Sequence, residues 1–141
     1  LIDIGGEVRT NGVRRRGSPW RVGIEPPDAG LSIRHIITPL SEAVASSGDY
    51  RNYFEADGKR YSHALDPRTG RPVTHDLAAV SVIQPSTIQA DALATMLLVM
   101  GPETAIAYAE ERDIPALFWL RTEQGPAAVN TRAFNRYLLR D

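Results

Sequence analysis

The sequence predicts an α+β fold built on a mainly antiparallel sheet. Strand-like runs joined by turn signals fill the first 84 residues, two helix patterns follow between residues 86 and 112, and further strand-like runs come after them. A run of strands followed by clustered helices is typical of α+β proteins. The 141 residues suit one domain with a substantial core, and no repeat, low-complexity tract or composition break marks a boundary within them.

Composition excludes several classes of protein. The chain holds 16 basic and 17 acidic residues, so no broad basic field predicts nucleic acid or an anionic membrane as a partner. It has no cysteine, which excludes a disulfide scaffold and thiolate metal sites but fits either redox compartment. No stretch approaches the ~20 apolar residues of a transmembrane helix, and no signal peptide is visible. The chain begins within a strand pattern and without Met, so we expect a segment of a larger protein or a processed product.

The first half of the chain reads as strands separated by turns. Residues 1–8 alternate like one strand, and the Gly5–Gly6 pair within them indicates either a bulge or a close approach of backbone to a ligand. The three arginines at 14–16 are interpreted as a solvated loop. Asp57–Gly58 is a hairpin turn signal. Strand-like runs are predicted at residues 20–24, 31–40, 42–47, 53–56 and 59–63.

The second half carries clear start and stop signals. A strand at 78–84 ends at Pro85, and Ser86 then suits the N-cap of a helix that Gly101 terminates. Pro102 fits the first turn of a second helix over 103–112. Strands are expected at 114–121 and 127–130. Residues 131–139 close the chain as an amphipathic helix or a strand–helix hook, with three side chains packing inward: Phe134, Tyr137 and Leu138.

The helix over residues 86–100 organises the rest of the prediction. Four apolar residues at i, i+3, i+4 and i+7 predict one buried face: Leu93, Met96, Leu97 and Met100. The opposite side also carries apolar residues: Ile88, Leu98 and Val99. We therefore expect the helix to be buried on both sides.

Asp91 and Thr95 lie four residues apart on that second side, and are neighbours on the helix surface. A carboxylate among apolar neighbours is costly unless a positive charge meets it, and no Lys or Arg occurs between Arg71 and Arg112. The partner is then a distant residue or a bound cation, and carboxylate with hydroxyl oxygens suits Mg²⁺. Two readings stay open: a Mg²⁺ site, or an Asp91 that is paired with a distant Arg or exposed at the rim. An arginine against Asp91, or a carboxylate open to bulk solvent, would argue against the cation.

Two other segments are candidate site elements. Residues 46–51 form a small polar break that can place backbone amides beside an anion, although an ordinary turn is the alternative. His63 ends the second arm of the predicted hairpin and precedes a loop with two prolines and a glycine. A strand end followed by a stiff loop can position a catalytic side chain, and a structural role is the alternative. His35 and His75 have no predicted role.

Four segments occur in the same order as motifs of the ApbE family: LIDIGGEVRTNG, SSGDYRNYF, YSHALDPRTGRPV and QADALATMLLVMG. Together they cover nearly the whole chain, which therefore resembles this family of FAD:protein FMN transferases, long called thiamine biosynthesis lipoproteins. The resemblance implies that FAD and Mg²⁺ bind and that the FAD pyrophosphate is split. FMN is then attached to a Thr or Ser hydroxyl of a target flavoprotein with release of AMP, although some members instead hydrolyse FAD to FMN and AMP.

The resemblance also implies roles for individual residues. Asp91 and Thr95 would bind Mg²⁺, with the backbone carbonyl of Ala94 as a further ligand. His63 would accept the proton of the acceptor hydroxyl. Further residues would lie along the flavin nucleotide: Ser47, Gly48, Asp49, Tyr50 and Leu65, with His63 beside them.

One family motif does not occur in the sequence. Full-length members carry an upstream segment of D-L-G-x-I-A-K-G type that supplies another Mg²⁺ ligand and a contact to FAD. The resemblance therefore covers the C-terminal portion, and we expect a companion chain or a missing N-terminal segment to complete the site. The alternatives are a module that binds or hydrolyses FAD without transferase activity, and an inactive structural half-domain. Relatives are often periplasmic lipoproteins, so a periplasmic or inner-membrane-associated location is expected.

Overall fold

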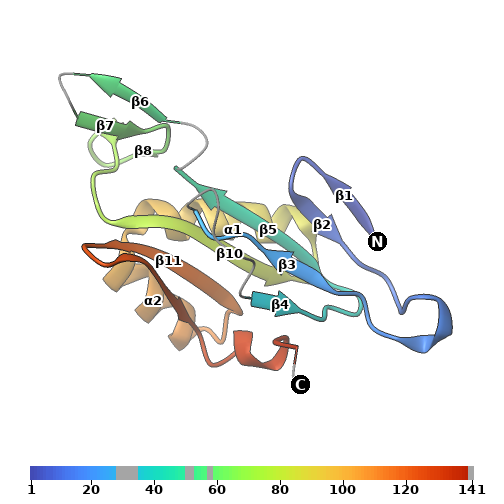
Figure 1. Cartoon of the computed structure of the whole chain (residues 1–141). Coiled ribbons are helices and arrows are strands. Elements are labelled where there is room, and N and C mark those ends of the chain that lie inside the picture. Colours follow the sequence, from blue (N-terminus) through green and yellow to red (C-terminus); the bar gives the residue numbers. More distant parts are fainter. Residues whose placement is uncertain (28–34, 50–52, 57–58, 140–141) are drawn as a thin grey trace.

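Residues 1–27, 35–49, 53–56 and 59–139 are described by the computed structural model of the chain (Figure 1). The central feature is a six-stranded sheet in which every neighbouring pair of strands is antiparallel. Its spatial order is β1 (Ile2–Ile4), β2 (Glu7–Arg9), β5 (Ala43–Gly48), β10 (Leu77–Gln84), β11 (Ala116–Thr122) and β12 (Gly125–Asn130). The predicted α+β fold with a mainly antiparallel sheet is confirmed.

Three pairs of short strands lie outside this sheet. They are β3 (Val22–Ile24) with β4 (His35–Ile37), β6 (Tyr53–Ala56) with β7 (Lys59–Ser62), and β8 (Leu65–Asp66) with β9 (Arg71–Pro72). The pairing of Ala56 with Lys59 confirms the predicted hairpin, whose turn residues Asp57 and Gly58 lie outside the described residues. Residues 31–34 of the strand predicted at 31–40 also lie outside them.

The expectation of one strand over residues 1–8 is wrong. The chain instead turns back at Gly5–Gly6, so that β1 and β2 form a hairpin with Ile4 opposite Glu7. Both glycines have positive φ, 68° and 107°, as a tight two-residue hairpin turn requires. The glycine pair is therefore a turn rather than a bulge within a single strand.

Two helices cover one face of the sheet (Figure 1). Helix α1 (Thr87–Met100) packs on β5 and β10, and α2 (Pro102–Glu111) packs on α1 and β11. The predicted signals hold: Ser86 is the N-cap residue, Gly101 ends α1 with φ 80°, and Pro102 begins α2. Within the described residues no helix is long and apolar enough to cross a membrane.

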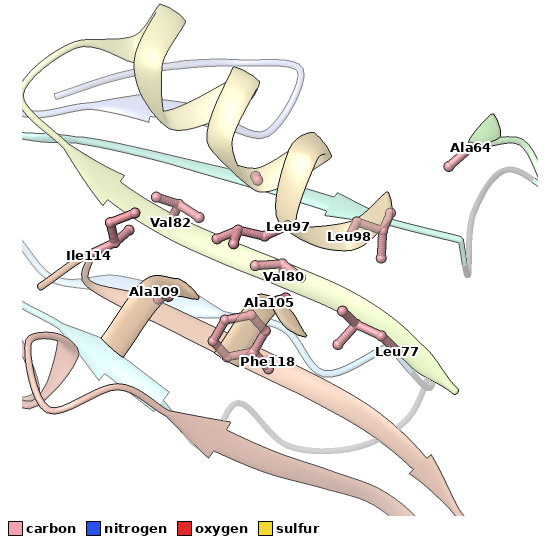
Figure 2. Packing of buried hydrophobic residues seen from close by; sticks show 12 residues of the cluster. Ala64, Leu77, Val80, Val82, Leu97, Leu98, Ala105, Ala109, Ile114 and Phe118 are labelled. Carbon is pink, nitrogen blue, oxygen red and sulfur yellow. The ribbon is translucent and has the colours of Figure 1, made fainter. Parts of the chain in front are cut away.

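The core has two layers because successive side chains of a strand point to opposite faces of the sheet. On β11, Phe118 faces the helices, whereas Leu117 and Trp119 face the opposite side. Leu97 points from α1 toward β10 in the helix-side layer (Figure 2). The other layer is closed by β3, β4 and the short helix η2 (Phe134–Arg136).

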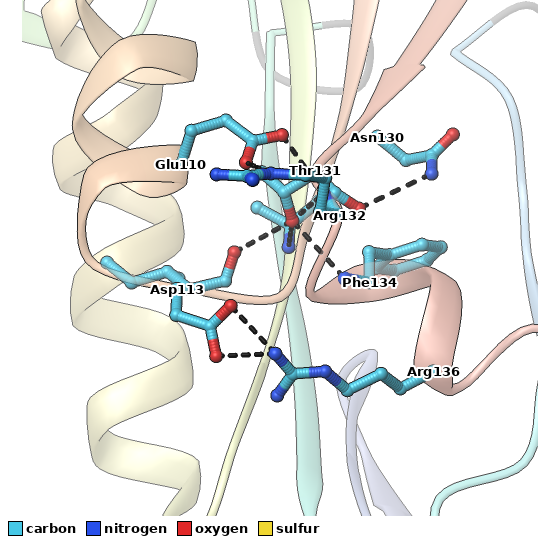
Figure 3. Close-up of polar contacts among 9 residues, drawn as sticks. Glu110, Asp113, Asn130, Thr131, Arg132, Phe134 and Arg136 are labelled. Atoms are coloured by element: carbon cyan, nitrogen blue, oxygen red, sulfur yellow. Dashed lines mark hydrogen bonds and ion pairs between the residues drawn. The ribbon is translucent and has the colours of Figure 1, made fainter.

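The C-terminal segment forms neither a long amphipathic helix nor a strand followed by a helix, the two predicted forms, but a hook made of η2 and a single bridge of Leu138 to Ile37. The predicted inward packing is confirmed, since Phe134 is fully buried while Tyr137 and Leu138 are partly buried against the same layer. Buried Thr131 anchors the hook, because its hydroxyl donates to the carbonyl of Ile114 at 2.8 Å and accepts from the amide of Ala116 at 3.0 Å. Arg132 pairs with Glu110 of α2 on the surface above (Figure 3). These bonds tie the hook to both α2 and β11.

The expectation that α1 is buried on both sides is wrong. The fully buried face consists of Ala90, Ala94, Leu97 and Leu98. Leu97 is thus the only fully buried member of the predicted face, since Leu93, Met96 and Met100 are partly buried, and Leu98 of the predicted opposite side is fully buried. On the outer side Ile88 is 82% exposed, and Asp91 and Thr95 are exposed as well. The physical reason is that α1 lies in a single helical layer, so the sheet covers only one of its faces.

Candidate active site

Thr95 and Ser47 are neighbours in space although 48 positions separate them. Ser47 lies on the helix-facing side of β5, in line with Ala43 and Ala45, which pack against Ala90 of α1. Thr95 lies one turn further along α1, and its Oγ1 is 2.8 Å from Oγ of Ser47. The structure therefore brings together two of the four motifs that the sequence places far apart.

Asp91 precedes Thr95 by one turn and projects from the same side of α1. Its carboxylate is exposed, and it makes no hydrogen bond or ion pair with any residue in the described part of the chain. The distant arginine partner is therefore absent among those residues, but so is the desolvation that made a cation necessary. Asp91 is exposed, as the alternative to a Mg²⁺ site predicted, so its burial gives no support to a bound cation and a Mg²⁺ site stays a prediction.

The donor set still fits part of a Mg²⁺ site. A carboxylate and a hydroxyl on adjacent turns supply hard oxygen ligands, and Mg²⁺ usually takes few protein ligands and keeps several waters. No cluster of three or more His, Asp or Glu side chains able to hold a metal occurs in the described ranges. Asp91 and Thr95 would thus hold the ion together with water and phosphate oxygens.

Ala94 occupies a different position from its two neighbours. Its side chain is fully buried, and its carbonyl lies in the interior of a regular helix, where each C=O accepts a bond from the N–H four residues on. The assignment of that carbonyl to the metal stays a prediction.

His63 is exposed in the connection between β7 and β8, as the strand-end reading predicts. The loop that follows is held by its own hydrogen bonds. The amide of Ala64 donates to Oγ of buried Ser62 at 3.1 Å, and the amide of Val73 donates to the carbonyl of Ala64 at 3.0 Å. These hydrogen bonds make the loop after His63 rigid, and a rigid loop is what the positioning of a reactive side chain requires.

An ion pair within this loop adds to its rigidity. Arg68 donates from Nε at 3.0 Å and from Nη2 at 2.8 Å to the two oxygens of Asp66, a bidentate geometry. These hydrogen bonds from Arg68 hold the pKa of Asp66 below its ordinary value. The carbonyl of Asp66 also accepts from the amides of Thr69 and Gly70 at 3.1 and 2.8 Å.

A groove of about 500 Å³ separates this loop from α1. Loop residues 65–68 line one side, and Thr95 with apolar residues of α1 lines the other. The YSHALDPRTGRPV motif thus lies beside the QADALATMLLVMG motif. The sequence pattern did not single out the apolar groove residues, because Met96 and Met100 belong to the predicted core face and Val99 to the opposite side, which was also predicted to be buried.

The turn after β5 has a structural partner that the sequence did not reveal. Asp49 is 7% exposed and forms an ion pair with Arg121 of β11, while its amide donates to the carbonyl of Ala78 at 3.0 Å. Gly48 pairs with Ala79 at the end of the β5–β10 ladder, and Tyr50 lies outside the described residues. The flavin contacts expected of this turn and of Leu65, which is 56% exposed, stay predictions.

A family model matches most of the chain. The model described as the ApbE family matches residues 1–118. The chain belongs to the ApbE family. It matches the C-terminal portion of its relatives and spans about two fifths of their length.

Two curated relatives illustrate the ApbE match. The FAD:protein FMN transferase of Vibrio cholerae is 46% identical over 139 residues, which cover 98% of this chain and 42% of the relative. The FAD:protein FMN transferase of Haemophilus influenzae is 38% identical over 138 residues, which cover 96% and 40% respectively.

Solved structures agree with the family assignment. The apo form of the Pseudomonas stutzeri flavinyl transferase ApbE superimposes with a TM-score of 0.83 at 48% identity, covering 95% of this chain and 41% of that one. The Vibrio cholerae flavin transferase ApbE gives a TM-score of 0.83 at 44% identity, covering 96% and 43%.

Proposed function

We propose that this chain forms the C-terminal part of an enzyme that transfers FMN from FAD to a Thr or Ser hydroxyl of a target flavoprotein, with release of AMP. The names of the relatives support flavin transfer, since they are FAD:protein FMN transferases. The observation that carries the proposal is the groove between the His63 loop and α1, which has Thr95 on one wall and Leu65 on the other.

In the proposed reaction His63 accepts the proton of the acceptor hydroxyl. The acceptor oxygen forms a bond to the FMN phosphorus of FAD, and the pyrophosphate bond from that phosphorus to the bridging oxygen breaks. The bridging oxygen leaves with AMP, so the acceptor gains FMN through a phosphoester. His63 is exposed, and this supports the role because an acceptor side chain from another protein must reach it. The rigid loop that follows His63 supports it as well.

Asp91 and Thr95 would hold Mg²⁺ in the proposed site, with Ala94 as a candidate third contributor. When bound, the ion neutralises negative charge on the pyrophosphate oxygens. Asp91 supplies the anionic ligand and Thr95 a neutral one, so removal of Asp91 is expected to weaken the site more.

We also propose that a further segment, from the same polypeptide or from a companion chain, completes the site. Two protein oxygens give a weak site, because affinity depends on the number and charge of the ligands. Apolar side chains are exposed on the outer side of α1 and on the edge strand β1, where Ile88 is 82%, Ile2 62% and Ile4 72% exposed. A covering segment would bury them and would also desolvate Asp91. A periplasmic or inner-membrane-associated location is proposed from the family resemblance alone.

A second candidate function is a module that binds or hydrolyses FAD without transferring FMN. The exposure of Asp91 favours this candidate, because it weakens the case for a tightly held metal. One experiment separates the candidates. The complete protein, with the segment that completes its site, is incubated with FAD and Mg²⁺, with and without a cell extract that supplies apo-flavoproteins, and AMP is measured by chromatography.

A transferase gives AMP together with flavin fluorescence that stays on a protein band through a denaturing gel. AMP and free FMN without such a band identify a hydrolase. FAD binding without AMP identifies a binding module, and no FAD binding identifies a structural half-domain. The last three outcomes each contradict the proposed transfer.

A further inference from the structure

We propose that Ser47 is a positioning residue for Thr95, orienting its hydroxyl for the cation rather than contacting the flavin nucleotide. This inference rests on the proposed Mg²⁺ site. The Oγ···Oγ1 distance of 2.8 Å is that of a good hydrogen bond between hydroxyls. Among the described residues it is the only hydrogen bond that the Thr95 side chain makes.

A threonine within a helix normally has two competing orientations. Its hydroxyl can donate to a carbonyl three or four residues earlier in the same helix, which is why its χ1 angle divides between two rotamers. A partner outside the helix favours one of them. Ser47 is such a partner, since it comes from β5 and not from α1.

The packing of small residues fixes this contact. Ala43 and Ala45 of β5 and Ala90 of α1 are fully buried against one another. Ala94, also fully buried, continues the same side of the helix. Because alanines allow close approach of helix and strand, two short side chains reach each other at the next position, Ser47 with Thr95.

The direction of the hydrogen bond follows from the chemistry of a hydroxyl. An oxygen that gives a lone pair to a cation has its proton free to donate, so Thr95 would donate and Ser47 would accept. Ser47 would thereby orient the free lone pair of Thr95 outward, toward the side of α1 that also carries Asp91.

The test measures metal binding directly and requires no turnover. Mn²⁺, which prefers the same hard oxygen ligands as Mg²⁺, is titrated without nucleotide into the complete protein, and its Kd is measured from the signal of free Mn²⁺ in electron paramagnetic resonance. Ser47→Ala is expected to raise this Kd about tenfold to a hundredfold, as loss of a residue that orients a metal ligand usually does. Ser47→Thr, which keeps the hydroxyl, should restore the affinity.

The chain offers a matched control on the same strand. Ser46 points to the opposite face of the sheet, where its Oγ lies 2.7 Å from Oγ of Ser81. Ser46→Ala should therefore leave the Mn²⁺ Kd unchanged. If Ser47→Ala lowers thermal stability too far for measurement, Ser47→Cys keeps the side-chain volume with a weaker acceptor and should still weaken Mn²⁺ binding.

Asp91→Ala and Thr95→Ala distinguish a failure of the metal site from a failure of the role of Ser47. If both raise the Kd while Ser47→Ala does not, the role of Ser47 is overturned and the metal site stands. If neither raises it, the metal site fails, and the role of Ser47 fails with it.

Discussion

Asp49, at the end of β5, is paired with Arg121 of β11 across the intervening strand β10. The two carry opposite charges, and the Asp49 side chain is only 10% exposed while that of Arg121 is 35% exposed. A turn that reads locally as a polar break is therefore held by a residue 72 positions later. This pair fixes the end of β5, close to where Ser47 meets Thr95.

Removing one member of this pair should destabilise the fold. Asp49→Ala leaves the partly buried Arg121 without its charged partner, so we expect a loss of about 1–3 kcal/mol in the free energy of unfolding. Urea denaturation measures it. Glu111→Ala, which removes an exposed partner of Arg112, is the control and should cost under about 1 kcal/mol. Equal effects of the two variants would show that the Asp49–Arg121 pair is an ordinary surface contact.

The ends of α1 could be predicted because their signals are local. Gly101 and Pro102 act through their own backbone preferences, and the structure places both where those preferences require. Ser86 stands at the predicted N-cap position, although its side chain makes no capping hydrogen bond there. The prediction of a single strand through Gly5–Gly6 is wrong because the alternation of apolar and polar residues continues across the turn. A two-residue turn keeps the period of the pattern while reversing the chain.

The sequence left the burial of Asp91 undecided for a different reason. Helical periodicity shows which residues share a face, but not whether another element covers that face. The contact of Ser47 with Thr95 and the ion pair of Asp49 with Arg121 depend on how strands and helix are placed relative to one another. Neither has a signature within its own segment.

Leu97 tests the predicted core face of α1. It is fully buried in the layer between helices and sheet, so Leu97→Ala should cost about 2–5 kcal/mol of unfolding free energy. Ile88→Ala is the control on the same helix, because Ile88 is 82% exposed, and in this chain without the proposed covering segment it should change stability by less than about 0.5 kcal/mol. A small effect at Leu97 would mean that α1 is not seated on the sheet as described.

Stability in acid should depend on Glu110. Hydrogen bonds from Arg132 lower the pKa of Glu110 from its ordinary value of 4.5. The folded state then holds the proton less tightly than the unfolded state, so the contribution of this pair is present above pH 4.5 and is lost as the pH falls through the lowered pKa.

Thermal melts are recorded from neutral to acidic pH. The difference in melting temperature between the unchanged protein and Glu110→Gln should become smaller as the pH falls through that window. Arg132→Gln removes the cause of the shift and should give the same narrowing. If the difference in melting temperature stays constant with pH, the charged hydrogen bond between Arg132 and Glu110 is not the cause of that difference.

His63→Ala should separate proton transfer from FAD binding. If His63 is the base, the variant keeps its affinity for FAD and transfers FMN about 10²–10⁴ times more slowly. Calorimetric titration with FAD and the rate of flavin attachment measure the two quantities. An equal loss of binding and transfer would instead assign His63 to holding the nucleotide.

The proposed reaction depends on Asp91 as the anionic ligand of the metal. Its carboxylate is exposed and unpaired within the described part of the chain, so Asp91→Asn should leave the unfolding transition almost unchanged. A matched control is Glu103→Gln, which neutralises an exposed carboxylate on the neighbouring helix α2.

The most direct measurement is Mg²⁺-dependent release of AMP from FAD by the complete protein and by these two variants. We expect release that requires Mg²⁺, persists in Glu103→Gln and disappears in Asp91→Asn while FAD still binds. AMP release by Asp91→Asn at the rate of the unchanged protein would contradict the proposed metal site.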